Sequence, residues 1–578
     1  MRSPLLLAAI ACHVVLAVLY ASFTPAFEGP DENTHYEYGL YLANAGKLPI
    51  TQPLANERGL PQAEGAILAH HPPLYYALLG AALSASGNSD TVFAPTSNRF
   101  RPKDPSRFMT HKHEAHVPSL LVGLRLTSVL LGVVTIVLVY AFGRVVAPGN
   151  AAVAGLAAFA VACLPMWSFL HGVLNSDVLA NVLSAATLLQ CARMLTREHN
   201  GHAQTVTLGV LVGLAWLTKT TTLFLGGLAF ATGCVLLWRA RRTDEWRPLL
   251  LRLLVAAAIT TALTGWVFVR NWSLYGDPLA MSAHDGTFQS YPPEWRWAYM
   301  LGPLYPGENP APVTFFPWIF TSLLGCFGWF RVPPEPPLVA VGAVLAGAAL
   351  VGVAWLLFDR ERRPRPLWLL LSACALVFLG AAWFNLKAAQ PQARLLFPAV
   401  APAAVLFAAG LLRVTTWLPK RAFALLLFPA IALFAFFHTF LPNFDPALAP
   451  VPPSHRSLVG DIVHSEHETI EWLQTLPAEP LTEPPTLRWR DPGATDATRY
   501  TLYLFDADGR VWLATHEWTK ASPNEVVIRG GEWRVSDAVW NNVPKGAPMR
   551  LRLRRVPASA DEVAEDLAAT PPLPFVRG

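Results

Sequence analysis

Charged residues are scarce in this chain. They make up 14% of its 578 residues, against 53% hydrophobic residues, whereas a soluble globular protein carries about 25% charged residues. A soluble protein of this composition would leave large apolar patches in water, so the expected solvent is lipid. The net charge of +5 is modest, and we expect no nucleic-acid partner for a chain with so little charge.

Cysteine is scarce as well. All six cysteines lie in or beside apolar stretches, and no two of them form a C-x-x-C pair. We therefore expect neither a disulfide framework nor a zinc site built from cysteine.

What the sequence does contain is a series of apolar stretches close to the ~20 residues that cross a bilayer. We predict about eleven transmembrane helices. They lie at 4–23, 120–146, 152–170, 177–195, 203–217, 220–238, 250–269, 337–358, 366–384, 396–415 and 421–441. The apolar stretches 73–86 and 313–330 are predicted to lie on or dip into the outer face, because counting either one as a span would reverse the sides of the loops that follow.

The Lys and Arg residues of the connections support this count. Cytoplasmic loops are rich in Lys and Arg, and eleven spans with the N-terminus inside place the basic clusters on one side. They are Arg144, then Arg193 with Arg197, and then the basic residues within 239–252, 360–365 and 413–421. The outer side then holds two long loops, 24–119 and 270–336, and the whole C-terminal tail.

The tail differs in character from the rest of the chain. Residues 1–441 form the predicted transmembrane domain, 442–483 a Pro-rich linker, and 484–578 a soluble domain. Period-two alternation around an Asp-Gly turn at 506–509 predicts short strands, as in an all-β sandwich. Its tryptophans are interpreted as core residues rather than sugar-stacking platforms. The predicted fold class is thus an α-helical polytopic membrane protein with outer juxtamembrane helices and a C-terminal β-sandwich-like domain.

Acidic residues mark the outer side at two points. Asp31 and Glu32 directly follow the first span, in Glu28-Gly-Pro-Asp-Glu-Asn-Thr-His35, and Asp177 begins the fourth span. Each acid alone is explained by capping of the helix that it precedes. Two carboxylates at one membrane level are also what a site needs to deprotonate a hydroxyl group and hold a divalent cation.

Five cations depart from the basic-inside pattern near this level. Lys219, Lys387 and Arg394 lie in short outer loops, and Arg125 and Arg270 lie near the outer ends of their spans. Long basic side chains can simply reach the lipid headgroups from there. A cation beside apolar sequence at the membrane edge also suits a lipid-linked phosphate, which Arg binds through two parallel hydrogen bonds.

Together these motifs resemble the GT-C superfamily of multi-pass glycosyltransferases, which use polyprenyl-phosphate sugars. The most similar type is the bacterial branch related to protein mannosyltransferases and lipid A aminoarabinose transferases. The motifs that carry the resemblance follow one another over about residues 1–440: Pro30-Asp-Glu-x-x-His35, His71-Pro-Pro-Leu-Tyr-Tyr76, Arg125-Leu-Thr-Ser-Val129, Asn175-Ser-Asp-Val-Leu-Ala-Asn181, Gly213-Leu-Ala-Trp-Leu-Thr-Lys-Thr220, Arg270-Asn-Trp-Ser-Leu-Tyr-Gly-Asp-Pro278, Phe327-Gly-Trp329 and Gln392-Ala-Arg-Leu-Leu-Phe-Pro398. The expected Gln-Gly-Arg-Tyr form reads Gln392-Ala-Arg-Leu here, without the aromatic residue.

The resemblance implies a role for each of these residues. Asp31 would be the catalytic carboxylate, with Glu32 and Asp177 assisting it and holding a divalent cation, Mg²⁺ or Mn²⁺, if one takes part. The donor phosphate would bind the cations, and the acceptor would bind near two histidines. The expected donor ligands are Arg394, Lys219 and Arg125, and the acceptor-side residues are His71 and His35.

The implied activity moves a hexose or pentose from a polyprenyl phosphate to an acceptor hydroxyl. Direct displacement, with Asp31 as the base, would invert the anomeric centre. The expected partners are a polyprenyl-phosphate-linked sugar, a glycan or lipid acceptor, and membrane lipids. The expected location is the bacterial inner (plasma) membrane, with the active site and tail on the periplasmic, extracytoplasmic face. A secondary transporter and a non-catalytic envelope-assembly protein are the alternatives.

Overall fold

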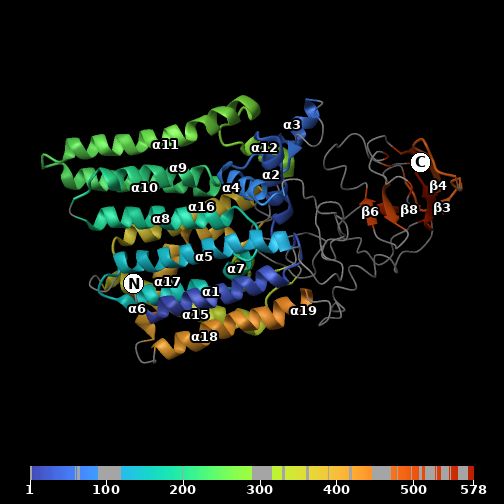
Figure 1. The fold of residues 1–578 in the computed structure, drawn as a ribbon. Helices are drawn as coiled ribbons and strands as arrows, with labels where there is room; N and C mark the ends of the chain where they lie inside the picture. Colours follow the sequence, from blue (N-terminus) through green and yellow to red (C-terminus); the bar gives the residue numbers. More distant parts are fainter. Residues whose placement is uncertain are drawn as a thin grey trace.

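The computed structural model describes a long helical bundle followed by two small β-sheets (Figure 1). The description covers residues 3–58, 60, 65–88, 119–197, 199–288, 315–327, 332–359, 364–387, 390–415, 420–444, 470–477, 479–495, 498–506, 511–514, 528, 530–535, 540, 546, 548–556 and 570–577.

Eight helices of the described chain are long and apolar enough to cross a membrane. They are α1 (Pro4–Phe23), α5 (Ser119–Val146), α8 (Asp177–Thr196), α10 (Phe224–Ala240) with the 3₁₀ turn η2 (Thr220–Thr222), α11 (Trp246–Tyr275), α15 (Pro336–Phe358), α16 (Leu367–Lys387), and α17 (Val400–Val414) with the 3₁₀ helix η5 (Ala393–Ala399). A helix of 20 residues is ~30 Å long, which matches the hydrocarbon core of a bilayer. The chain is therefore a helical, multi-span membrane protein.

The other three predicted spans form shorter helices. They are α6 (Ala151–Ala162) with α7 (Pro165–Leu170), α9 (His202–Trp216), and α18 (Lys420–Phe434) with the π-helical turn η6 (Ala435–Phe440) and α19 (Leu441–Phe444). Pro165 interrupts the third predicted span because proline at the start of α7 cannot continue the hydrogen bonding of α6. The stretches predicted not to cross are also short: α4 (Leu74–Ala85), and α14 (Phe315–Thr321) with η4 (Ser322–Leu324).

Small residues let the helices approach closely. A Cβ atom added at Gly352 of α15 would lie 1.9 Å from the carbonyl oxygen of Gly410 in α17. Lipid provides no hydrophobic drive for two helices to associate, so contact of this kind contributes through van der Waals packing. Glycine at both positions therefore holds α15 against α17.

The first long loop builds a layer across one end of the bundle, called here the α2 end. Its described elements are α2 (Glu32–Ala45), β1 (Ile50–Thr51), α3 (Gln52–Glu57), β2 (Gly65–Ala66) and α4, and β1 pairs with β2 in parallel. Aromatic residues of α2 and α4 pack together, with Tyr38 stacked on Tyr76 at 3.9 Å between ring centroids. From the second long loop, α12 (Met281–Phe288) lies at the same end (Figure 1).

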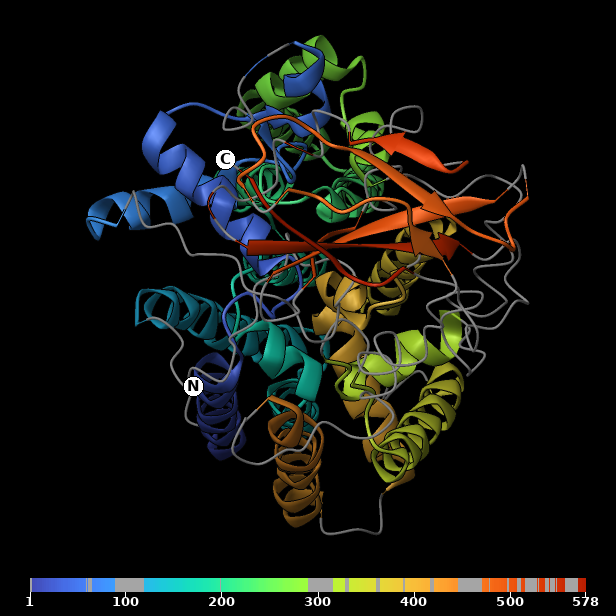
Figure 2. The ribbon, with the colours of Figure 1, turned by 90° about the vertical axis from the view of Figure 1, so that its right-hand side faces the viewer.

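The C-terminal region contains two antiparallel sheets, in agreement with the strand prediction. One sheet has the order β3-β4-β7 and the other β6-β5-β8-β9. The strands are β3 (Glu471–Trp472), β4 (Thr486–Arg490), β5 (Arg499–Asp506), β6 (Val511–Ala514), β7 (Glu532–Arg534), β8 (Pro548–Val556) and β9 (Leu573–Val576). Seen from the α2 end, the strands lie in front of the helices (Figure 2).

The core of this region contains two of its tryptophans. Trp489 and Trp540 are buried among Leu487, Leu551 and other apolar side chains. The interpretation of these tryptophans as core residues therefore holds for them. Strand β3 lies inside the predicted linker, because Trp472 pairs with Trp489 and extends the smaller sheet.

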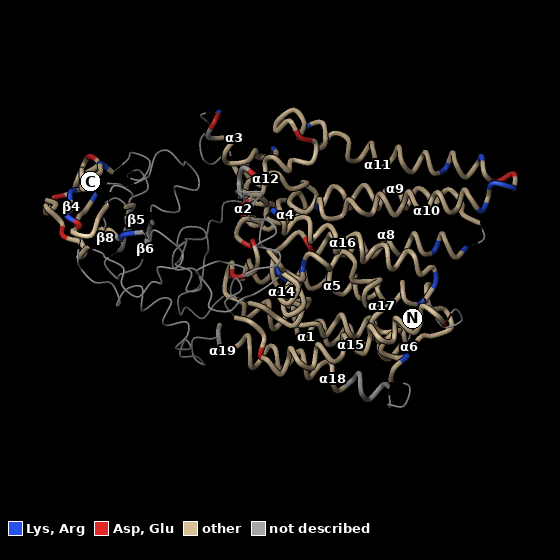
Figure 3. Tube along the Cα trace, turned by 180° about the vertical axis from the view of Figure 1, so that it is seen from behind, with Lys and Arg blue, Asp and Glu red and all other residues tan. Residues whose placement is uncertain are grey.

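Charge separates the two ends of the bundle (Figure 3). Lys and Arg gather at the end opposite to α2, where the connections between α8 and α9 and between α10 and α11 lie. The α2 end carries acidic residues together with cations such as Arg125, Lys219 and Arg394. The two ends differ in charge, as the assignment of the loops predicts.

Candidate functional site

Asp31 stands immediately before α2 in an unusual backbone conformation. Its φ is +59°, in the left-handed region that non-glycine residues seldom adopt. The side chain makes no capping hydrogen bond to α2. Its Oδ2 atom lies 2.7 Å from Nη2 of Arg394 instead. The side chain of Asp31 is therefore directed to a cation and not to the helix that it precedes.

Asp177 is the first residue of α8 and is also paired with cations. Its Oδ1 atom accepts a hydrogen bond from Nζ of Lys219 at 2.7 Å. Its Oδ2 atom lies 3.8 Å from Nη1 of Arg394. Arg394 thus stands between the two carboxylates, and the four residues form an alternating chain: Lys219, Asp177, Arg394 and Asp31. We call this chain the charge network.

The cations of the charge network come from the breaks between helices. Lys219 lies in extended backbone between α9 and η2, and Arg394 lies in η5. The amide nitrogen of Ala393, next to Arg394, donates to Oγ of Ser322 at 2.9 Å. The structure therefore brings together four of the predicted site residues from segments that are far apart in sequence.

The charge network is unevenly exposed. The side chain of Asp31 is 34% exposed, whereas that of Asp177 is 3% exposed. Burial acts to raise the pKa of Asp31, but the positive charge of Arg394 and its hydrogen bond outweigh burial and hold the pKa below its ordinary value. Asp31 is ionised at neutral pH and is the member of the network most accessible to a ligand.

Glu32 and Arg125 form a separate, fully buried pair. Nε and Nη2 of Arg125 donate to the two carboxylate oxygens of Glu32 at 2.8 and 2.6 Å. The remaining N–H groups of Arg125 donate to the carbonyl oxygens of Ala21, Thr24 and Pro25. Glu32 also accepts from the amides of Phe27 and Leu174, both at 2.9 Å.

This pairing differs from the roles expected from the sequence. All five N–H donors of Arg125 are used internally, so none is available to a donor phosphate. All four acceptor positions of Glu32 are used as well, which leaves none for a metal ion. Through Leu174, Glu32 joins the loop before Asp31 to the loop before Asp177. The pair holds the two acidic loops together and contacts neither Arg394 nor Lys219 through a hydrogen bond.

The two predicted acceptor-side histidines also meet. Nδ1 of His35 and Nδ1 of His71 lie 2.9 and 2.8 Å from the hydroxyl oxygen of Tyr76. Burial lowers the pKa of His35 to about 3 and the pKa of His71 well below its ordinary value, so both rings are neutral at pH 7. Tyr76 was not among the predicted site residues, although its place five residues after His71 was visible.

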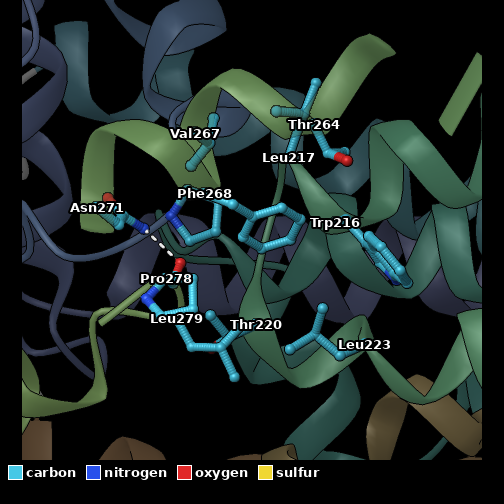
Figure 4. A pocket seen from close by; sticks show the side chains of 11 residues that line it. Trp216, Leu217, Thr220, Leu223, Thr264, Val267, Phe268, Asn271, Pro278 and Leu279 are labelled. Atoms are coloured by element: carbon cyan, nitrogen blue, oxygen red, sulfur yellow. Dashed lines mark hydrogen bonds between the residues drawn. The ribbon is translucent and has the colours of Figure 1, made fainter. Parts of the chain in front are cut away.

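An apolar pocket lies beside the segment that carries Lys219 (Figure 4). Its lining residues are Pro72, Trp216, Leu217, Thr220, Leu223, Thr264, Val267, Phe268, Asn271, Pro278 and Leu279. Nδ2 of Asn271 donates to the carbonyl oxygen of Pro278 at 3.2 Å and so fastens the turn after α11 (Figure 4). No charged side chain lines the pocket, which is a small apolar gap between packed helices.

The residues expected to hold a divalent cation do not fit that role as they are arranged. Glu32 is saturated by Arg125 and backbone amides, and Oδ1 of Asp177 is engaged by Lys219 while Oδ2 lies 3.8 Å from Arg394. Within the described part of the chain, no three His, Cys, Asp or Glu side chains gather as a metal-binding group.

The fold and the charge network define a multi-span membrane protein with paired acidic and basic groups at one end of its bundle. Residues 119–266, about a quarter of the chain, match the family model of the dolichyl-phosphate-mannose-protein mannosyltransferases. This segment includes Asp177, Lys219 and Arg125. The resemblance inferred from the motifs is confirmed over this segment.

Several solved structures match this chain at low sequence identity. ArnT from Cupriavidus metallidurans in the apo state is 16% identical, with a TM-score of 0.42, and the match covers 72% of this chain and 60% of that chain. The archaeal oligosaccharyltransferase AglB from Archaeoglobus fulgidus, in complex with an inhibitory peptide and a dolichol-phosphate, is 14% identical, with a TM-score of 0.42 and coverages of 74% and 55%.

The Pmt1-Pmt2 protein O-mannosyltransferase complex of S. cerevisiae, bound to its sugar donor, is 17% identical, with a TM-score of 0.32 and coverages of 51% and 37%. The chain thus spans about 60% or less of the chains that it matches. Among curated proteins, none matches this sequence.

Proposed function

We propose that this protein is a membrane glycosyltransferase that moves a sugar from a polyprenyl phosphate to an acceptor hydroxyl. The observation that carries the proposal is the charge network, in which Arg394 joins Asp31 to Asp177. Burying four charged groups at the end of an apolar bundle costs desolvation energy that packing does not require. Such groups in a membrane protein are retained for function, and the family match over residues 119–266 supports the same reaction class.

In the proposed reaction, Asp31 is the base. The acceptor oxygen forms a bond to the anomeric carbon while the bond from that carbon to the phosphate oxygen breaks. The acceptor proton passes to the carboxylate of Asp31, and the electron pair of the broken bond leaves with the phosphate. Displacement in one step inverts the anomeric centre. Lys219 and Arg394 stabilise the negative charge that the leaving phosphate gains.

The surroundings of the charge network support a lipid-linked donor and a polar acceptor. Apolar side chains close to Lys219 in sequence, among them Leu217 and Leu223, offer hydrocarbon contact. His35, His71 and Tyr76 provide neutral hydrogen-bonding groups that suit a sugar or another hydroxylated acceptor. We place this end of the bundle, and the sheets beyond it, on the extracytoplasmic face of a bacterial plasma membrane.

The test is transfer by the purified, reconstituted protein. Radiolabelled polyprenyl-phosphate hexoses and pentoses are supplied as donors, and an envelope fraction from cells lacking the protein is supplied as acceptor. Replacing Asp31→Asn should lower transfer by roughly 10²-fold or more, because loss of a positioned base costs about 10²–10⁴-fold. Asp285→Asn is the matched control, since Asp285 pairs with Lys387 outside the charge network.

Two outcomes would contradict the proposal. Absence of transfer from every donor would remove the enzyme hypothesis, and substrate uptake into proteoliposomes without transfer would favour a secondary transporter. Full transfer by the Asp31→Asn protein would remove Asp31 as the base while leaving the reaction class intact. The same assay with excess chelator tests the expected Mg²⁺ or Mn²⁺, and we expect transfer to continue because Glu32 and Asp177 are already occupied.

A further inference from the structure

The charge network is electrically balanced before any ligand arrives. Asp31 and Asp177 contribute two negative charges, and Lys219 and Arg394 contribute two positive charges. Three of the four side chains are no more than 10% exposed. A sugar linked through one phosphate to a polyprenol carries one negative charge. Adding that charge to a balanced, poorly hydrated cluster is unfavourable unless the phosphate replaces a carboxylate as the partner of one of the two cations.

Other partly buried cations at the α2 end are already engaged in the described part of the chain. Arg125 is saturated by Glu32 and backbone carbonyl groups. Lys387 pairs with Asp285 at 3.1 Å. Nη2 of Arg270 donates to the carbonyl oxygen of Pro49 at 2.7 Å. A donor phosphate that binds at the charge network must therefore pair with Lys219 or Arg394.

The geometry shows which of the two carboxylates can lose its ion pair with Arg394 more easily. Asp177 is 3% exposed and is fixed by Lys219 at 2.7 Å, with Arg394 at 3.8 Å on its other oxygen. Asp31 is 34% exposed, and within the described part of the chain its ion pair joins one oxygen, Oδ2, to Arg394. A ligand approaching from the exposed side meets Asp31 first. Displacing Asp31 breaks that one ion pair and returns a carboxylate to a partly hydrated position.

We propose that Asp31 and the donor phosphate compete for Arg394, so that arrival of the donor releases the base. This inference rests on the proposed function and specifies how its site is regulated. While Asp31 holds Arg394, the carboxylate is a weak base and the phosphate subsite is closed. When the phosphate takes Arg394, Asp31 loses its neutralising partner and becomes a stronger base beside the acceptor.

The same competition accounts for release of the product. Transfer leaves a polyprenyl phosphate on Arg394 and the acceptor proton on Asp31. Loss of that proton to water restores the negative charge of Asp31. The carboxylate then competes again for Arg394 and expels the polyprenyl phosphate. The donor therefore binds before Asp31 is activated, and the deprotonation of Asp31 promotes departure of the spent lipid.

The experiment measures equilibrium binding of farnesyl phosphate to the purified full chain, with farnesol as the uncharged control ligand. The variants are Asp31→Asn, Asp31→Ser and Arg394→Gln, with Asp285→Asn as the matched control. Removing the carboxylate at position 31 should tighten farnesyl phosphate binding by about three- to tenfold, because the phosphate no longer competes with it. Arg394→Gln should weaken binding by roughly tenfold or more. Farnesol binding and Asp285→Asn should be unchanged.

The two proposals fail in distinguishable ways. If Arg394→Gln weakens binding but both position-31 variants bind farnesyl phosphate no more tightly than wild type, the phosphate site stands and the competition is overturned. If Arg394→Gln leaves binding unchanged, the phosphate site of the proposed function is itself overturned. Thermal unfolding of each variant identifies misfolded protein, and the serine variant serves where the asparagine variant does not fold.

Discussion

Arg125 donates to both carboxylate oxygens of Glu32, from Nε at 2.8 Å and from Nη2 at 2.6 Å, and both side chains are fully buried. The two residues are 93 positions apart in the sequence. This pair fixes the end of α1 and, through the amide of Leu174, the loop before α8. The loops that carry Asp31 and Asp177 are therefore held in place by a second, buried ion pair.

Glu32→Gln should destabilise the protein strongly. Glutamine keeps the shape but removes the negative charge, so the buried guanidinium of Arg125 loses its counter-ion. Breaking a buried pair in this way costs about 3–5 kcal/mol. The midpoint of thermal or denaturant unfolding measures the change. Glu245→Gln is the control, because Glu245 is 59% exposed and lies 3.9 Å from Arg252; its effect should stay within about 0.5 kcal/mol. Equal stability of the two variants would show that the charge of Glu32 is dispensable.

Tyr76→Phe should weaken the acceptor side while leaving the charge network in place. The hydroxyl group of Tyr76 is shared by His35 and His71, and its loss leaves the buried ring of His35 and the partly buried ring of His71 without that partner. An unsatisfied buried polar group costs about 1–3 kcal/mol. We expect KM for the acceptor to rise with little change in farnesyl phosphate binding. Tyr140→Phe removes a hydroxyl that accepts from Arg144 at 3.3 Å and should change neither quantity. Weaker phosphate binding by Tyr76→Phe would place Tyr76 on the donor side instead.

Gly352→Ala should loosen the contact between α15 and α17. The added Cβ would lie 1.9 Å from the carbonyl oxygen of Gly410, and overpacking of this kind costs about 1–3 kcal/mol. Gly347→Ala on the same helix is the matched control, since its added Cβ would have nothing within 4 Å. That change should be neutral or stabilise the helix by up to about 1 kcal/mol. A lower unfolding temperature for Gly347→Ala than for Gly352→Ala would contradict this account of the packing.

The C-terminal sheets should lose stability in acid through Asp491. Burial acts to raise the pKa of Asp491, but hydrogen bonds from Arg555 and Tyr500 outweigh it, and the pKa lies below the ordinary 3.8. A lowered folded-state pKa adds stability that is fully present above the unfolded-state pKa and is lost as the pH falls through the folded-state value. Hydrogen exchange in β5 and β8, corrected for the intrinsic rate, should therefore speed up below about pH 4.

Asp491→Asn should remove this acid dependence. The control is Glu471→Gln, because Glu471 is 67% exposed and lies 3.8 Å from Arg490. This variant should retain the wild-type dependence on pH. An unchanged acid response in the Asp491→Asn protein would contradict the assignment.

Much of the helical architecture could be predicted from the sequence, because lipid demands long apolar runs. The prediction of 4–23 agrees with α1 at both ends. The scarcity of charge also made the outer cations conspicuous, so Lys219 and Arg394 could be singled out before their partners were known. The structure places both beside the predicted carboxylates Asp31 and Asp177.

Other features could not be predicted because they depend on contacts distant in sequence. Arg125 and Glu32 were predicted as ligands of a phosphate and a metal, since nothing local indicated that they pair with each other. Strand β3 was assigned to the linker because two residues give no alternating pattern, and only pairing with β4 reveals it. Tyr76 was missed because an aromatic residue in an apolar helix is usually a packing residue.

The hydrogen bond from the amide of Ala393 to Oγ of Ser322 fixes the backbone next to Arg394. Ser322 follows α14 in the second long loop, whereas Asp31 belongs to the first. The guanidinium that holds Asp31 is thus anchored through its own backbone to the opposite loop. The position of Arg394 therefore depends on both long loops, on the first through Asp31 and on the second through Ser322.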